Sequence, residues 1–319
     1  YRKTRERLAN KDSKPLLSLQ EAIDNKFLFD WTNYQPPRPS FNGEKQIKGL
    51  KIKDIREYID WTIFFRSWDL AGQFPKILED EVVGEAASSL YEDALVMLDK
   101  LENEDSIKLE AVIGFWQAHQ ENDNEICLFD EKKENLLARL NCLRQQKPQG
   151  IRPNFCLADF IKPASELMED HIGAFAVSAG KGVEEKCLEY ENNNDDYSSI
   201  MLKAIADRLA EALAEYMHER VRKEFWGYAK DENLTNEELI KEKYMGIRPA
   251  PGYPACPDHS EKDKLFSLLN SENIVDISLT ENFAMYPAAS VSGWYFSHPD
   301  SKYFGVGKIG QDQVKAISD

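Results

Sequence analysis

The chain has 319 residues, and its 56 acidic against 40 basic residues give a formal net charge of −16 at pH 7. With 42% hydrophobic and 11% aromatic residues it has enough apolar side chains for a sizeable core, which excludes a chain that is disordered throughout. The acidic balance argues against a nucleic-acid partner, because nucleic-acid binders carry basic surfaces. No apolar run approaches the roughly 18 residues of a membrane helix, so we expect no membrane partner.

Residues 1–20 are charged and weakly patterned, and they begin with Tyr1 and show no apolar signal region. We predict that they form a connector and that residues 21–319 form one domain. The basic residues of the connector are more typical of a solvated linker than of a docking site for an acidic partner.

Cysteine and histidine usage limits the chemistry that we expect. Five cysteines occur without a C-x-x-C pair, which predicts neither a disulfide framework nor a zinc knuckle and fits a reducing cytoplasm. The five histidines include no H-E-x-x-H motif and no tight cluster with cysteine. We therefore expect no metal site built within this chain.

The first half of the chain mixes helical and strand-like patterns. Three prolines between 36 and 39 restrict the backbone to an extended stretch. Apolar residues recur at helical spacing over 85–101, and the period changes to two over 107–115, as in a strand. The polar run 120–125 then predicts a turn, and the apolar run 126–129 predicts a returning strand.

The second half continues this mixture. The remaining predicted elements are, in order, a helix at 131–146, a strand at 171–178, a helix at about 198–227, and strands at 274–279 and 290–296. A Thr-x-x-Glu capping box at 235–238 predicts one more short helix, closed by Gly246. Because strands and helices come in clusters rather than in strict βαβ alternation, we predict an α+β fold instead of a doubly wound sheet.

Two motif-like patterns do not support the chemistry that they suggest. Gly305–Gly310 matches G-x-G-x-x-G, but a dinucleotide site needs a helix and a second strand after it, and only nine residues follow. Cys256 and His259 are close in sequence, yet no neighbouring residue is placed to orient the histidine, so we predict no cysteine nucleophile.

The least ordinary stretch runs from Arg248 to His259, with four prolines in nine positions. Prolines exclude a helix and a central strand, so we predict a stiff extended loop whose backbone carbonyls are free to accept from a ligand. The Arg248 fork suits a carboxylate, and Tyr253 offers an aromatic face. A proline-rich surface crossing with Arg248 in a structural ion pair is an equally good interpretation.

A second candidate is Asp60, which lies among five aromatic residues between positions 58 and 68. An acidic group in such surroundings suits a cationic ligand through charge and cation–π attraction. The alternative is a buried aromatic helix that Asp60 caps. A third candidate is the aromatic cluster at residues 291–304. The alternative interpretation is that this segment forms a core strand and a turn.

Four segments, taken in order, resemble the activation domain of cobalamin-dependent methionine synthase: Asp60–Thr62, Gly114–Trp116, Arg248–His259 and Ser292–His298. The resemblance covers essentially the whole chain. It implies a twisted, mainly antiparallel sheet flanked by helices, and a module that binds S-adenosylmethionine. Residues 1–20 would then link it to a preceding cobalamin-binding module.

By this resemblance the ligand-binding residues are Asp60, Arg248, Tyr303, Phe304, Glu211, Ala250 and Tyr253, with no catalytic residue and no metal ligand. The chemistry agrees with that set. S-adenosylmethionine presents a carboxylate for Arg248, an ammonium and a sulfonium group for Asp60 and Glu211, and an adenine for carbonyls and aromatic faces.

The implied function is to support reductive methylation of cob(II)alamin to methylcobalamin, with the methyl group from S-adenosylmethionine and an electron from a flavodoxin-like reductant. The chain would be a methyltransferase fragment that cannot make methionine alone. It lacks the Asp-x-His-x-x-Gly cobalamin motif, which 169–173 resembles only superficially, and zinc is expected only in another module. We expect a monomer.

An alternative function is a non-catalytic interaction module that docks the flavodoxin-type electron donor. Arg220, Arg222 and Lys223, near the end of the predicted long helix, would then face the acidic donor. A solvated helix end is the better explanation of these three residues.

Overall fold

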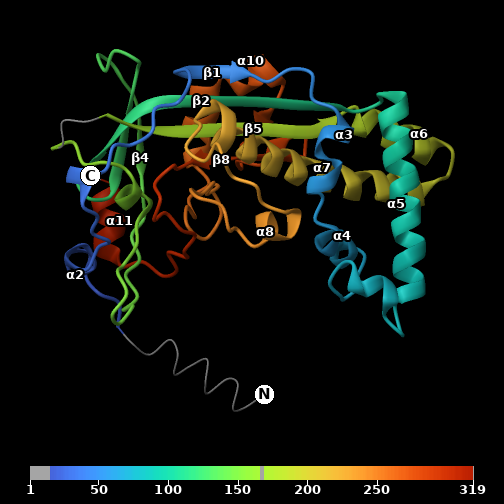
Figure 1. Cartoon of the computed structure of the whole chain (residues 1–319), viewed down its shortest axis with the longest axis horizontal. Coiled ribbons are helices and arrows are strands. Elements are labelled where there is room, and N and C mark those ends of the chain that lie inside the picture. The colour runs from blue at the N-terminus through green and yellow to red at the C-terminus, as the bar shows by residue number, and fades with distance from the viewer. Residues whose placement is uncertain (1–14, 166–168, 319) are drawn as a thin grey trace.

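Two long strands, β2 (Lys108–Glu121) and β5 (Asp170–Lys181), span the centre of a six-stranded sheet (Figure 1). The computed structural model describes residues 15–165 and 169–318. The sheet order is β4-β3-β2-β5-β8, and β1 also pairs with β2. All of these pairings are antiparallel. The α+β class with an antiparallel sheet flanked by helices is confirmed.

The other elements complete this framework. The remaining strands are β1 (Gly43–Gln46), β3 (Glu125–Phe129), β4 (Leu136–Asn141), β6 (Ser278–Leu279), β7 (Met285–Tyr286) and β8 (Ser290–Tyr295). The α-helices are α2 (Leu19–Asp24), α3 (Ile52–Ile55), α4 (Trp61–Ser67), α5 (Gly84–Glu104), α6 (Val183–Asn192), α7 (Asp196–Arg220), α8 (Asn236–Ile240), α9 (Glu261–Leu269), α10 (Ser271–Val275) and α11 (Gln311–Ser318). Short 3₁₀ turns occupy Trp31–Asn33, Arg56–Tyr58, Lys76–Glu79 and Leu157–Phe160, and α7 continues as a π-helical turn over Val221–Phe225. Within the described ranges, no helix has the length and apolar character needed to cross a membrane.

Both faces of the central strands are buried, because side chains alternate between two cores. On β2, Ile113 and Phe115 join the core beneath α5 and α7, whereas Val112 and Trp116 join the core on the opposite face. The predicted strand at 107–115 is confirmed but continues to Glu121, so the turn is shorter than predicted.

The helical layer on one face follows its predicted pattern. The apolar side chains that recur at helical spacing along α7 are all buried, namely Leu202, Ile205, Leu209, Leu213 and Met217. Helices α5 and α6 pack against α7, as Figure 1 shows. Helix α5 confirms the prediction for 85–101, and the capping box that begins α8 at Thr235 is present.

Two of the predicted elements are wrong. Residues 131–146 form a turn, the edge strand β4 and a loop instead of a helix, because β4 pairs with β3. The Asp130 carboxylate closes that turn by accepting from the Glu134 N–H at 2.8 Å. The strand predicted over 274–279 is reduced to β6, because most of this segment belongs to α10 and the turn after it. Helix α8 also ends before Gly246.

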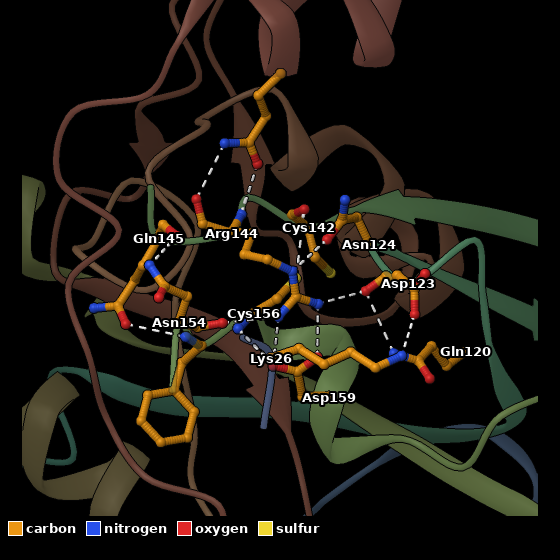
Figure 2. A network of polar contacts seen from close by, with 12 residues as sticks. Lys26, Gln120, Asp123, Asn124, Cys142, Arg144, Gln145, Asn154, Cys156 and Asp159 are labelled. Carbon is orange, nitrogen blue, oxygen red and sulfur yellow. Dashed lines mark hydrogen bonds and ion pairs between the residues drawn. The ribbon is translucent and has the colours of Figure 1, made fainter. Parts of the chain in front are cut away.

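Arg144, in the loop after β4, is completely buried and lies at the centre of a polar network (Figure 2). Its guanidinium forms a bidentate ion pair with Asp159, with N–O distances of 2.8 and 2.7 Å. The other N–H groups donate to the Asn124 side chain and to the backbone carbonyls of Asp123 and Asn154. Every guanidinium N–H therefore has a partner, which is what a buried charge requires.

This region also joins both ends of the described chain. Gln313 on α11 exchanges two hydrogen bonds with the Arg144 backbone, at 2.7 and 3.1 Å. The Leu17 N–H donates to a carbonyl of the same loop at 2.8 Å. Residues 15–20 of the predicted connector thus contact the body of the domain, whereas residues 1–14, with their basic residues, lie outside the described ranges.

Candidate functional site

A cleft of about 390 Å³ opens between α4, α7 and the segment that runs from α8 to the proline-rich loop. This volume lies within the roughly 300–1,000 Å³ of ligand pockets. Three of the predicted binding residues, Asp60, Glu211 and Arg248, line it together although they come from three separate parts of the sequence. The other charged residues that line it are Arg208, Glu215 and Glu242.

Asp60 caps helix α4 and also lines the cleft. It is the N-cap of α4, and its Oδ1 accepts from the Thr62 N–H at 2.9 Å. The aromatic residues that follow, including Phe64 and Phe65, are buried in the core. The Asp60 carboxylate nevertheless lines the cleft, and no described cation forms an ion pair with it. Its charge is therefore available to a cationic ligand.

Helix α7 presents several charged residues to the cleft. Arg208, Glu211 and Glu215 follow one another at three- and four-residue spacing, which places them on one helix face. Glu211 is exposed, and no hydrogen bond or ion pair joins it to another described residue. Glu215 is buried and paired instead.

Arg248 is held by contacts with four side chains. Its Nη2 lies 2.7 Å from Glu215 Oε2, and its Nη1 lies 3.1 Å from His218 Nδ1 and 3.0 Å from the Tyr244 hydroxyl. The backbone N–H of Arg248 donates to the Tyr303 hydroxyl at 3.0 Å. The structural ion pair considered for Arg248 is therefore present, and the same side chain also lines the cleft.

Protonation states in this cluster follow from burial and charge. Burial alone would lower the pKa of Arg248, but the Glu215 carboxylate and the neighbouring tyrosines together outweigh burial, and the pKa is raised. Burial, together with the charges of Arg222 and Arg248, holds the pKa of His218 well below its usual value. His218 is therefore neutral, and its Nδ1 accepts the hydrogen bond from Arg248.

The proline-rich loop packs along the edge strand β8. Ile247 and Phe296 exchange backbone hydrogen bonds of 3.1 and 3.0 Å, and the Trp294 N–H donates to the Pro249 carbonyl at 2.9 Å. A Cβ on Gly293 would lie 2.9 Å from the Pro249 oxygen, so the loop can approach β8 this closely only because residue 293 is glycine.

The expectation that the loop carbonyls are free is wrong for about half of them. Those that accept backbone hydrogen bonds belong to Pro249, Ala250, Tyr253, Pro254, Cys256 and His259. Positive-φ geometry at Gly252 lets the loop turn back on itself and form some of these bonds. A ligand would have to use the second lone pair of such a carbonyl, because the first is already engaged.

The other predicted residues lie outside the cleft lining. The Tyr303 hydroxyl contacts two residues that do line the cleft: it accepts from the Arg248 backbone N–H and lies 3.3 Å from the Tyr244 hydroxyl. Phe304 faces Phe155, with ring centroids 5.8 Å apart. Tyr253 is 62% exposed at the turn of the loop, and Ala250 lies before that turn.

Sequence reasoning missed Glu215, Tyr244, Glu242 and Arg208 as cleft residues. Glu215 and Arg208 lie one turn either side of Glu211 on α7, so helical periodicity from Glu211 would have found both. Tyr244 and Glu242 precede the proline-rich loop, in a stretch without any pattern that predicts a site.

The basic residues at the end of α7 are engaged within the domain. Arg222 is completely buried and forms a bidentate pair with Glu232, with N–O distances between 2.7 and 3.0 Å. Arg220 pairs with Glu224, and Lys223 pairs with Glu219. The interpretation of Arg222 as part of a solvated helix end, or as a contact for a partner, is therefore wrong.

His171 does not fit the role of a cobalamin ligand. It lies on the central strand β5, and its side chain is buried. Burial lowers the pKa of His171 to about 4 and raises the pKa of the neighbouring Asp170 to about 7. The Asp170 carboxyl accepts from the backbone N–H groups of Lys162 and His171, so this pair belongs to the core.

One group of described side chains has the composition of a metal site. The pairing of β2 with β3 places His119 opposite Cys127, and their ligand atoms and those of Glu121 lie within 4.8 Å of one another. Arg139 Nη1 already supplies a cation there, 2.9 Å from Glu121 Oε2 and 3.3 Å from Cys127 Sγ. Burial raises the pKa of the Cys127 thiol to about 12. We assign no metal to this group.

The fold is an α+β domain with an antiparallel sheet. Its cleft, lined by unpaired carboxylates and a half-buried guanidinium, suits a zwitterionic or cationic ligand. Residues 51–319 match the family model described as vitamin B12 dependent methionine synthase, activation domain, and the chain belongs to this family. It is also similar to a crystal structure of the MetH reactivation domain bound to AdoHcy (S-adenosylhomocysteine). The two chains are 50% identical and superpose with a TM-score of 0.92, over 96% of this chain and 94% of that one.

Proposed function

We propose that the cleft binds S-adenosylmethionine and presents its methyl group to reduced cobalamin carried by another module of the same protein. The observation that carries this proposal is that Asp60, Glu211 and Arg248 line one cleft. They offer two free carboxylates and one guanidinium to a molecule that has an ammonium, a sulfonium and a carboxylate group. The AdoHcy bound to the similar MetH domain supports it.

The reaction asks little acid–base chemistry of this chain. Cobalamin is the methyl acceptor, and one electron from a flavodoxin-like donor first reduces cob(II)alamin. The sulfonium S–CH₃ bond then breaks, its electron pair stays on sulfur, and the methyl group passes to the reduced cobalt. No proton moves in this transfer, so the work of the domain is to bind and orient the donor.

Methyl transfer in trans tests this function. The wild-type chain, mixed with S-adenosylmethionine and a separately purified, chemically reduced cobalamin module of a related enzyme, should support methylation. The rate should be low, because a natural tether's effective concentration is missing. Asp60→Asn should weaken S-adenosylmethionine binding about tenfold, since the neutral amide attracts a cation less. Asparagine also caps helices well, so α4 should remain intact.

A matched control exists within the chain. Asp30 begins the same Asp-Trp-Thr sequence, and its Oδ1 accepts from the Thr32 N–H at 3.0 Å, as Asp60 does with Thr62. Asp30 does not line the cleft, so Asp30→Asn should transfer methyl groups at the wild-type rate. Equal losses in both variants, or no transfer by the folded wild type, would count against the proposed function and favour a module that only docks the electron donor.

A further inference from the structure

We propose that Glu215 is a specificity-determining residue that acts through Arg248. By pairing with the guanidinium, Glu215 partly neutralises it, so the cleft accepts a carboxylate only when a neighbouring ammonium group accompanies it. This inference rests on the proposed S-adenosylmethionine site and adds a selection rule to it. The amino acid end of the ligand is bound as a zwitterion, and a ligand that carries the carboxylate alone is rejected.

The first support is the fixed geometry of Glu215. Its Oε2 lies 2.7 Å from Arg248 Nη2, and the side chains of Glu215 and Arg248 are only 11% and 19% exposed. Glu215 Oε1 is buried without a hydrogen-bond partner and lies 3.9 Å from Arg222 Nη1, which also has none. Arg222 is locked by its bidentate pair with Glu232. Glu215 is therefore held between two guanidinium groups, one of them immobile.

The second support is the charge of the cleft. Four carboxylates and two guanidinium groups line it, which gives a net charge of −2 at neutral pH. A ligand with a lone carboxylate meets this negative field and finds the Arg248 charge already balanced by Glu215. A zwitterion brings a cation for Asp60 or Glu211 together with its carboxylate. In a partly buried cleft these charge terms are screened less than in water.

Two adenosyl compounds with one difference measure the selection directly. AdoHcy carries both charges, and its 2-oxo acid analogue replaces the ammonium-bearing carbon with a ketone and keeps the carboxylate. Calorimetry on the wild-type chain should give a much smaller dissociation constant for AdoHcy. In Glu215→Gln the dissociation constant of the analogue divided by that of AdoHcy should fall about tenfold. The reason is that the carboxylate of the analogue then meets an Arg248 charge that no carboxylate balances.

Controls separate charge from structure. Glu215→Asp keeps the charge and should retain the wild-type preference. Glu224→Gln, which removes an exposed carboxylate paired with Arg220, should leave the ratio unchanged. Glu215→Gln also leaves Arg248 less well paired and destabilises the fold. The ratio of the two dissociation constants is therefore also measured for the wild-type chain at increasing salt concentration. Added salt should lower this ratio, since screening weakens the repulsion of the lone carboxylate.

The outcomes are distinct. If Glu215→Gln weakens the binding of both compounds equally, or leaves the ratio of their dissociation constants at the wild-type value, the selection role is overturned even though the ligand site exists. A wild-type ratio that does not change with salt also overturns it. A wild-type chain that is folded and binds neither compound contradicts the proposed function itself.

Discussion

Buried histidines show how single residues set the pH range of this domain. His298 lies among aromatic rings, with the Phe29 centroid at 4.3 Å, and its Nδ1 accepts from the Asp300 N–H at 3.1 Å. Burial lowers the pKa of His298 to about 4. The folded protein therefore keeps this ring neutral at pH values where the unfolded chain takes up a proton.

The sign of the resulting pH dependence is determined by that shift. Between about pH 6.5 and 4 the unfolded state binds more protons at His298, so the free energy of unfolding decreases as pH falls, by about 1.4 kcal/mol per unit at most. In His298→Asn this contribution is absent, and the free energy from urea unfolding should depend less steeply on pH. The control is His259→Asn, at an exposed position. Wild-type steepness in His298→Asn would show that the ring titrates normally.

Arg248 illustrates what residue-level reasoning achieves and where it stops. Its sequence surroundings supported a ligand contact and an ion pair equally, and the structure contains the ion pair at the wall of the cleft. The partner, Glu215, was not predicted, because a glutamate on a long helix looks the same whether it faces solvent or a buried arginine. Only the packing of α7 against the proline-rich loop distinguishes the two.

At the scale of elements, the proline-rich loop depends on the strand beneath it. Gly293→Ala would place a methyl group 2.9 Å from the Pro249 carbonyl oxygen, a backbone atom that cannot rotate away. We expect this substitution to destabilise the protein by about 1–3 kcal/mol and to weaken ligand binding, because Arg248 adjoins the displaced residue.

Gly305→Ala is the matched control for this prediction. Its new methyl group would meet only Pro254 Cβ at 3.6 Å, an ordinary contact. Thermal unfolding and ligand titration should be close to wild type. If Gly293→Ala also behaves like wild type in both measurements, the loop does not depend on close contact with β8.

Elements were predictable where local pattern and tertiary packing agree. The apolar stripe of α7 and the alternation of β2 both face cores in the structure, so their periodicity identified them. The helix predicted at 131–146 is wrong because the glutamate, lysine, leucine and arginine residues of this segment favour a helix, whereas pairing with β3 makes part of it an edge strand. Strand pairing is a long-range property that local propensity does not contain.

At the scale of the whole molecule, the Arg144 network could not be predicted from the sequence. Its hydrogen bonds join residues as far apart as Arg144 and Gln313, which are 169 positions apart. No spacing rule relates such residues. The network fixes the loop after β4 to α11 and to the short turn that contains Asp159, and Gln145 in the same loop donates to the Gly305 carbonyl at 2.7 Å. The segment that holds Tyr303 is thereby anchored to the core.

The central claim is that the cleft binds an adenosyl sulfonium through its amino acid end, and one measurement tests it most directly. Calorimetric titration of the folded chain with S-adenosylmethionine should show one site, which AdoHcy also occupies. Arg248→Ala should weaken binding by about 1.5–3 kcal/mol, or roughly 10- to 150-fold, provided that circular dichroism shows a folded variant. A flat titration of the folded wild type with both compounds, or wild-type affinity in folded Arg248→Ala, would contradict the account.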